Sequence, residues 1–228
     1  HDWQEPRRSV QLILLFGAID LLKSEKWIAP IRAAYPTAHF LGCSTAGEIF
    51  DTQVADDSLV ATAIEFEHTR VRGNYIRTQD TDNSFQAGAR LAQTFDPKEL
   101  VHLFILSDGL CVNGSELIRG LRAHLPDTVT LTGGLSADGD RFQETLVLSG
   151  ETIDRGLVAA VGLYSNRLTV GYASWGGWVP FGPKRLITKS QGNVLYELDG
   201  QSALDLYKKY LGDYASGLPA TGLLFPLH

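Results

Sequence analysis

Two short glycine-containing segments have the residue types best suited to holding a small ligand. One spans residues 42–48 and reads Gly-Cys-Ser-Thr-Ala-Gly-Glu, and the other spans residues 133–139 and reads Gly-Gly-Leu-Ser-Ala-Asp-Gly. Small residues at the end of a strand let the backbone approach a ligand closely and expose N–H groups that can hold an anion. A tight turn without a ligand would explain either loop alone, but a pair of such loops favours a shared site. The candidate ligand-binding residues in these loops are Gly42, Cys43, Ser44, Thr45, Ala46, Gly47, Glu48, Gly133, Gly134, Ser136 and Asp138.

The first loop is also close to a nucleophile elbow, G-x-S-x-G, with Ala46 in the place of the second glycine. A hydrolase that uses Ser44 would need a general base, and His39 lies only five residues earlier, on the same expected strand. Cys43 is no better as a nucleophile, because a carboxylate at Glu48 would raise the pKa of its thiol. A serine hydrolase therefore stays an alternative, and we assign no catalytic residue.

Two further segments offer groups for a pocket. Trp175, Trp178 and Phe181 lie among glycines and prolines and could form an aromatic wall for a ligand, or an aromatic plug between domains. Ser107 and Asp108 follow an expected strand; such a pair is usually a turn, but this position faces the same sheet edge as the glycine loops. We add all five residues to the candidate ligand-binding site.

The histidines give no metal signature. Four of them are internal, and no two have the spacing of metal ligands, so we expect no structural zinc site; they are His39, His68, His102 and His124. Haem held by a single histidine would leave no spacing to find, so a haem cofactor remains open. The sequence contains neither a P-loop nor a G-x-G-x-x-G motif.

The elements that position these loops recur along the chain. Residues 59–66 are echoed by residues 157–164, and each glycine loop follows a short strand that comes after a helix. We therefore expect an α/β fold whose mixed sheets are built from two tandem copies of a strand-helix-strand-strand-strand-helix unit. Residues from about Val10 to Thr94 should then superpose on those from about Val101 to Leu211.

Residue patterns predict the individual elements. Apolar and β-branched runs predict strands at 10–16, 101–106 and 129–131, and a hairpin of 157–164 with 168–174. Helices should begin after Asp82 or Asn83, after Asn113 and after Ser202, which are capping residues. Pro30 makes a helix near Trp27 less regular. Residues 221–227 resemble the opening strand of a unit, which suggests that the intact protein continues.

Composition excludes several classes of protein. The 228 residues have a net charge of −6, which argues against a nucleic-acid partner. No apolar run approaches the roughly 20 residues of a membrane helix. The start of the chain has no signal-peptide pattern, and two cysteines are too few for a disulfide scaffold. These features are typical of a cytoplasmic protein.

Five segments together resemble the FIST family, the "F-box and intracellular signal transduction" proteins. They are residues 41–49, 131–139, 176–183, 187–190 and 198–207. The resemblance implies a FIST N-terminal domain at residues 10–164 and the beginning of a truncated FIST C-terminal domain at 165–228. It also implies a bacterial sensory input module that binds a small ligand and signals to an output domain or histidine kinase.

The resemblance also bears on the ligand and on catalysis. Amino-acid-like ligands have been proposed for the family, and some members are haem-dependent nitric oxide sensors, which makes a haem-based sensor an alternative function. Because the resemblance brings no assured catalytic residue, it favours binding over catalysis. We therefore do not expect an enzyme.

Overall fold

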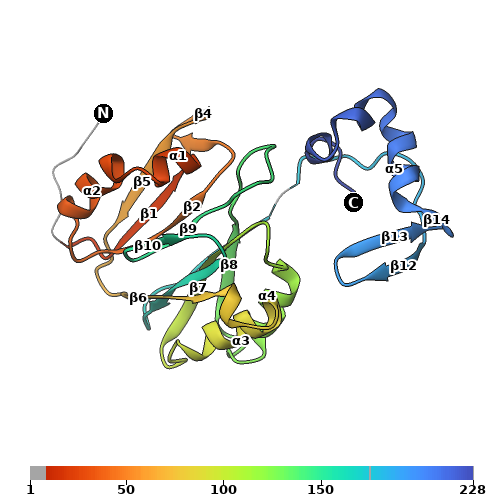
Figure 1. The fold of residues 1–228 in the computed structure, drawn as a ribbon. Coiled ribbons are helices and arrows are strands. Elements are labelled where there is room, and N and C mark those ends of the chain that lie inside the picture. Colours follow the sequence, from red (N-terminus) through yellow and green to blue (C-terminus); the bar gives the residue numbers. More distant parts are fainter. Residues whose placement is uncertain (1–8, 175, 228) are drawn as a thin grey trace. The chain divides into compact units, whose positions relative to one another are not determined.

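A computed structural model describes residues 9–174 and 176–227 of the chain, in two compact units that divide between Tyr172 and Ala173. The first unit contains both glycine loops. It has two mixed β-sheets, a separate two-stranded hairpin and four α-helices (Figure 1). The second unit has a three-stranded sheet and one α-helix. Within the described residues, no helix combines the length and apolarity needed to cross a bilayer.

The first sheet has the strand order β10-β9-β2-β1-β5. β1 runs parallel to β2, with Leu12 opposite His39, and antiparallel to β5, with Leu12 opposite Ile64. Its strands are β1 (Leu12–Gly17), β2 (His39–Ser44), β5 (Leu59–Ile64), β9 (Val147–Ser149) and β10 (Thr152–Asp154). Between β2 and β5, the chain forms the hairpin of β3 (Glu48–Phe50) and β4 (Gln53–Ala55).

The second sheet has the order β6-β11-β7-β8. β7 runs parallel to β8, with His102 opposite Thr130, and antiparallel to β11, with Val158 opposite Ser107. Its strands are β6 (Arg70–Arg77), β7 (Leu100–Ser107), β8 (Thr130–Leu135) and β11 (Leu157–Tyr164). All eight residues of β11 are buried, as expected for a central strand covered on both faces.

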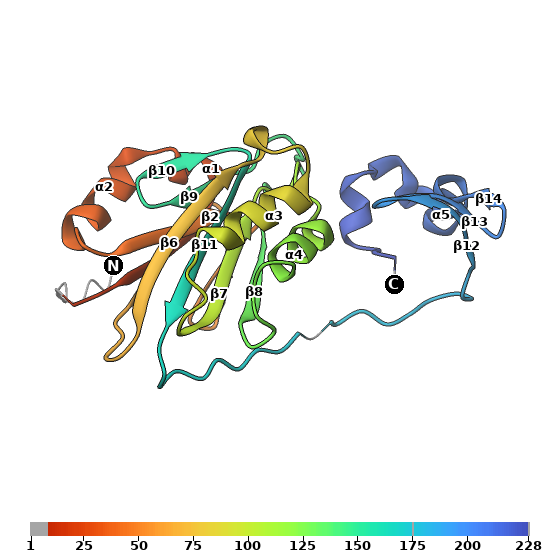
Figure 2. The same ribbon diagram turned by 90° about the horizontal axis from the view of Figure 1, so that it is seen from below.

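The helices and sheets of the first unit lie in four layers (Figure 2). Three clusters of apolar side chains join the layers. One cluster packs helices α1 (Ile19–Leu22) and α2 (Glu25–Ala34) on the outer face of the first sheet. A second cluster lies between the two sheets. A third packs helices α3 (Ser84–Gln93) and α4 (Gly114–Arg122) on the outer face of the second sheet. The order is therefore helix, sheet, sheet, helix.

Several predicted elements are confirmed. The strands expected at 10–16, 101–106, 129–131 and 157–164 correspond to β1, β7, β8 and β11. Asn83 caps α3 by accepting a hydrogen bond from Gln86 N–H, and Asn113 caps α4 in the same way through Glu116 N–H. Pro30 lies inside α2, whose ten residues remain helical around it.

The two sheets share one arrangement of three strands. β5 has the same position and direction beside β1 and β2 that β11 has beside β7 and β8. The neighbouring elements differ, however: β6 follows β5 in the chain but pairs with β11, and the β9–β10 hairpin extends the first sheet. A tandem duplication of the whole six-element unit is therefore not confirmed.

Two predictions about elements were wrong, the strands at 168–174 and 221–227. Residues 168–174 form no strand, because β6 already pairs with the edge of β11 that a partner at 168–174 would have needed. Residues 221–227 begin in a 3₁₀ turn (Ala220–Leu223) between Pro219 and Pro226, and not in a strand. Helix α3 follows β6 in the chain, as the predicted order of elements requires, and packs with α4 on the second sheet.

The second unit is a small sheet followed by helices. Strands β12 (Ile187–Gln191), β13 (Val194–Leu198) and β14 (Gln201–Ser202) form the sheet. Helix α5 (Ala203–Leu211) begins at the predicted cap, where the Ser202 hydroxyl accepts a hydrogen bond from Asp205 N–H at 3.3 Å. The unit buries few large apolar side chains; Ala203 and Leu211 are the buried hydrophobic residues described in it.

Candidate functional site

Gly42 and Gly133 occupy equivalent places, each opposite the first strand of its sheet. Gly42 pairs with Leu15 across β1 and β2, and Gly133 pairs with Ile105 across β7 and β8. A Cβ on Gly42 would lie 2.0 Å from the Leu15 carbonyl oxygen, and one on Gly133 would lie 1.8 Å from that of Ile105. Both glycines therefore allow close packing of strands, a role that does not depend on a ligand.

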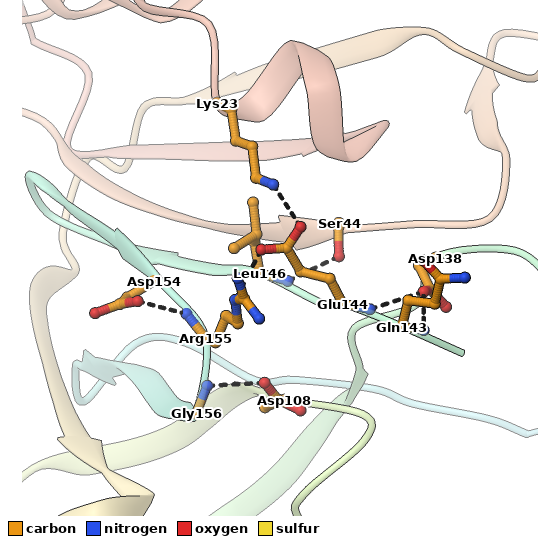
Figure 3. Close-up of polar contacts among 10 residues, drawn as sticks. All are labelled: Lys23, Ser44, Asp108, Asp138, Gln143, Glu144, Leu146, Asp154, Arg155 and Gly156. Atoms are coloured by element: carbon orange, nitrogen blue, oxygen red, sulfur yellow. Dashed lines mark hydrogen bonds and ion pairs between the residues drawn. The ribbon is translucent and has the colours of Figure 1, made fainter. Parts of the chain in front are cut away.

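The loops that follow these strands meet each other. The Ala137 N–H donates a hydrogen bond to the Ser44 carbonyl at 2.9 Å, which joins the second loop to the end of the first strand pair. Ser44 is fully buried, and its hydroxyl accepts a hydrogen bond from the Leu146 N–H at 3.0 Å (Figure 3). These hydrogen bonds hold the two loops next to each other in the first unit.

A cleft of about 310 Å³ lies where the loops meet. Its size is within the range of small-molecule sites, which is roughly 300–1,000 Å³. Five carboxylate side chains and one arginine line it, so the described lining is strongly acidic. The lining residues are Ala18, Thr45, Ala46, Gly47, Glu48, Asp56, Asp57, Asp138, Gly139, Asp140 and Arg141.

The carboxylate of Glu48 is already hydrogen-bonded by the protein. It is 3% exposed and accepts hydrogen bonds from the Thr45 hydroxyl at 2.5 Å, the Ser58 hydroxyl at 2.5 Å and the Ser58 N–H at 3.1 Å. These bonds fasten the base of the β3–β4 hairpin to the first loop. Glu48 therefore acts on the cleft mainly through its charge.

Asp138 has a similar structural role in the second loop, where its carboxylate binds backbone N–H groups. Its carboxylate accepts hydrogen bonds from the backbone N–H groups of Phe142, Gln143 and Glu144 at 3.1, 2.7 and 3.0 Å. Figure 3 shows the bonds from Gln143 and Glu144. Burial alone would raise the pKa of Asp138, but the three N–H groups outweigh burial and hold the pKa below its ordinary value. Asp138 is therefore a fixed negative charge that closes the loop.

Ser107, Asp108 and Ser136 form a buried polar cluster, in which Ser136 bonds to the Ser107 carbonyl, and they are not part of the cleft lining. The carboxylate of Asp108 accepts hydrogen bonds from the N–H groups of Leu110 and Gly156, each at 2.8 Å. Figure 3 shows the bond from Gly156. Burial would raise the pKa of Asp108, but these backbone donors lower it overall. The cluster ties the end of β7 to the start of β11, and a binding role for it stays a prediction.

The aromatic residues belong to the other unit. Trp175 lies outside the described residues, while Trp178 and Phe181 are 58% and 92% exposed in a stretch without regular secondary structure. Their contribution to a ligand site therefore stays a prediction.

The geometry gives little support to a serine or cysteine nucleophile in the first loop. The Ser44 hydroxyl is buried and bonded to Leu146, and burial raises the pKa of the Cys43 thiol to about 12. A reactive nucleophile needs an accessible position and an activating base or cation. The first loop therefore resembles a turn with a structural role more than the exposed turn that carries a catalytic serine.

The ring nitrogens of His39 and His102 face other protein groups, and a haem cofactor stays an alternative prediction. Both ring nitrogens of His102 contact threonine hydroxyls, at 2.6 Å for Thr130 and 3.0 Å for Thr132. The Nε2 atom of His39 is buried against Gly73, where an added Cβ would be only 1.7 Å away. Neither of the two cavities described for the chain is lined by a histidine. In the described residues, no cluster of three or more His, Cys, Asp or Glu side chains is arranged to hold a metal.

The sequence reasoning missed four charged residues of the cleft. Asp56 and Asp57 reach it from the end of the β3–β4 hairpin, and Asp140 and Arg141 directly follow the second glycine loop. The cluster of charges just after residue 139 was a usable signal. Asp56 and Asp57 reach the cleft because the β3–β4 hairpin lies beside the first loop, and no local sequence pattern predicts that position.

The fold and the cleft define a four-layer α/β domain with an acidic site between two loops. The FIST N domain family model matches residues 11–201, and the chain belongs to the FIST family, a family of signal-transduction sensory domains. The match extends past residue 164, where the sequence resemblance had placed a domain boundary; that boundary stays a prediction.

The chain is also similar to an uncharacterized protein, MJ1623, of Methanocaldococcus jannaschii. The two are 22% identical over 217 residues, which is 91% of this chain and 42% of the other protein. The chain therefore spans about two fifths of the length of that relative.

Proposed function

We propose that the chain is a sensory input module that binds a small, amino-acid-like ligand in the cleft between the two glycine loops. The observation that carries the proposal is the hydrogen bond from Ala137 N–H to the Ser44 carbonyl, which places both loops beside one cleft. Membership of a sensory family supports binding over catalysis.

The charges of the cleft favour a ligand with an amine. Asp56, Asp57 and Asp140 are exposed and line the cleft, and the fixed carboxylates of Glu48 and Asp138 add to the negative field. Arg141 is the cation in the lining and would take a carboxylate. Direct recognition of the amine is thus assigned to the exposed aspartates, because the partners of Glu48 and Asp138 are already in place.

The contacts of the two loops suggest how ligand binding in the cleft is signalled to the rest of the protein. Glu48 joins the first loop to the β3–β4 hairpin, and Asp138 joins the second loop to residues 142–144. A ligand that touches both loops would bias the position of both segments. We propose that this change reaches an output domain or a partner histidine kinase in the cytoplasm.

A ligand screen by thermal unfolding tests this proposal, with the common amino acids and their decarboxylated amines as probes. A probe at 100 times its dissociation constant should raise the free energy of unfolding by about 2.7 kcal/mol. Ala46→Trp should abolish that shift by filling the cleft, because Ala46 is exposed and lines it.

Ala123→Trp is the matched control, since Ala123 is exposed at the end of α4 and does not line the cleft. It should leave the shift intact. A shift that survives Ala46→Trp, or the lack of a shift with every probe, would contradict the proposal.

A further inference from the structure

A second cavity, of about 480 Å³, lies in the first unit beside α1, the start of α2 and the β9–β10 hairpin. It shares no lining residue with the cleft between the loops. Its volume also suits a small molecule. Nothing in the family match or in the relative assigns a role to it.

Two cations from different elements meet on one carboxylate in this cavity. The Lys23 ammonium and the Arg155 guanidinium both pair with Glu144, Arg155 through Nε at 2.7 Å (Figure 3). Lys23 lies at the end of α1, and Arg155 directly follows β10. The contact with Lys23 and the charge of Arg155 hold the pKa of Glu144 below its ordinary value. Glu144 thus occupies the place that the carboxylate of a bound molecule would take.

The rest of the lining offers an apolar surface and two free carboxylates. Leu22, Leu146 and Ile153 supply the apolar part. Glu25 and Glu151 have no ion-pair or hydrogen-bond partner among the residues that the structure describes. The cavity therefore combines cations, apolar side chains and unpaired anions.

The charge balance restricts the guest. The lining has two cations and four carboxylates, a net charge of −2, and one of these carboxylates, Asp154, pairs with Arg77 outside the cavity. A purely anionic guest would add to this negative charge. A guest with both charges would exchange for Glu144 and also neutralise a free glutamate.

We propose that this cavity is a second binding site, for a small zwitterion with an apolar substituent. Its carboxylate replaces Glu144 between Lys23 and Arg155, and its ammonium group lies near Glu25 and Glu151. Its apolar part packs on Leu22, Leu146 and Ile153. This site does not depend on a ligand in the cleft between the loops.

Three matched probes test the charge requirement on the whole chain. They are L-leucine, 4-methylpentanoate (which lacks the ammonium group) and 3-methylbutylamine (which lacks the carboxylate). Titration followed by amide chemical shifts should show saturable binding of leucine at Leu22–Glu25 and Glu144–Arg155 amides. Each half-ligand should bind at least about tenfold more weakly, a difference of 1.4 kcal/mol. No saturable shift with leucine at millimolar concentration, or equal binding of the amine, would overturn the proposal.

Variants separate this site from structural effects. Lys23→Gln with Arg155→Gln should weaken leucine binding at least about tenfold. Lys26→Gln with Arg119→Gln, which removes two cations that do not line the cavity, should have no effect. Glu144→Gln should strengthen binding, because it removes the charge that competes for both cations; weaker binding would mean that Glu144 only supports the fold, and would contradict the proposal.

The loop variant distinguishes the two proposals. Ala46→Trp should leave leucine binding at this cavity unchanged. If Ala46→Trp abolishes leucine binding while Lys23→Gln with Arg155→Gln does not, leucine occupies the cleft; this second site is then wrong and the proposed function stands.

Discussion

Gly42 and Gly133 lie at the same point of two different sheets, and at both positions a carbonyl oxygen of the adjacent strand fills the space of a Cβ. Gly134, the next residue, has open space around it. Gly47 and Gly133 also share a second reason for glycine, because their φ angles of +144° and +153° lie in the region that favours it. The sequence identified these glycines as special but could not separate strand packing from ligand approach, since both require a missing side chain.

Alanine substitutions at Gly42 and Gly134 test whether strand packing requires a glycine at the first position and not at the second. Gly42→Ala should lower the free energy of unfolding by at least about 2 kcal/mol, because the new methyl group collides with the Leu15 carbonyl. Gly134→Ala should change it by less than about 0.5 kcal/mol. Chemical denaturation measures both, and equal losses would contradict the packing role of Gly42.

Two histidines, the buried His102 and the half-buried His39, should make stability depend on pH. Burial lowers the pKa of His39 and of His102, so protonation favours the unfolded chain, in which a histidine has a pKa of about 6.5. Stability is therefore full above about pH 6.5 and falls as the pH drops below that value, by at most about 1.4 kcal/mol per pH unit for each histidine. Denaturation between pH 7 and pH 5 should show this slope, and His102→Gln should reduce it. An unchanged slope in that variant would contradict the role of His102.

Helices α3 and α4 touch through their backbones at two glycines. A Cβ on Gly120 would lie 2.0 Å from the Phe85 carbonyl oxygen, and one on Gly88 would lie 2.2 Å from that of Leu117. The capping residues predicted where both helices begin, but a glycine inside a helix usually lowers its stability. Here the glycines allow the two helix backbones to approach each other closely.

Gly120→Ala should therefore destabilise the protein, by about 1–3 kcal/mol, although alanine is the better helix former. Gly114→Ala is the control, because its Cβ would meet only Leu135 Cδ2, at an ordinary 3.9 Å. Thermal unfolding should show a lower midpoint for Gly120→Ala and no loss for Gly114→Ala. A midpoint raised by Gly120→Ala would show that the helices do not pack in this way.

Element prediction succeeded where a local pattern decides the structure. The caps at Asn83, Asn113 and Ser202 and the apolar run of β11 are such cases, since each depends on adjacent residues. It failed for residues 168–174, whose apolar alternation suits a strand but whose place beside β11 is occupied by β6. Strand pairing depends on residues that lie far apart in the sequence. The pairing of β6 with the second sheet, and of the β9–β10 hairpin with the first, therefore could not be predicted from a local pattern.

At the scale of the molecule, the chain has two units joined through a stretch between β11 and β12 whose described residues form no helix or strand. Tyr172, Trp178 and Phe181 in this stretch are 68%, 58% and 92% exposed. Brief digestion with chymotrypsin should therefore cut here first and leave a resistant fragment that contains both sheets. Initial cleavage inside 12–164 would contradict this division.

The central claim is that the two glycine loops form one ligand site. The direct measurement is the amide spectrum of the whole chain during titration with the amino acid or amine that gives the largest thermal shift. We predict saturable changes at residues 45–48 and 138–141 together, with one dissociation constant, and their loss in Ala46→Trp. Changes confined to one loop, or no saturable change in either, would contradict the claim.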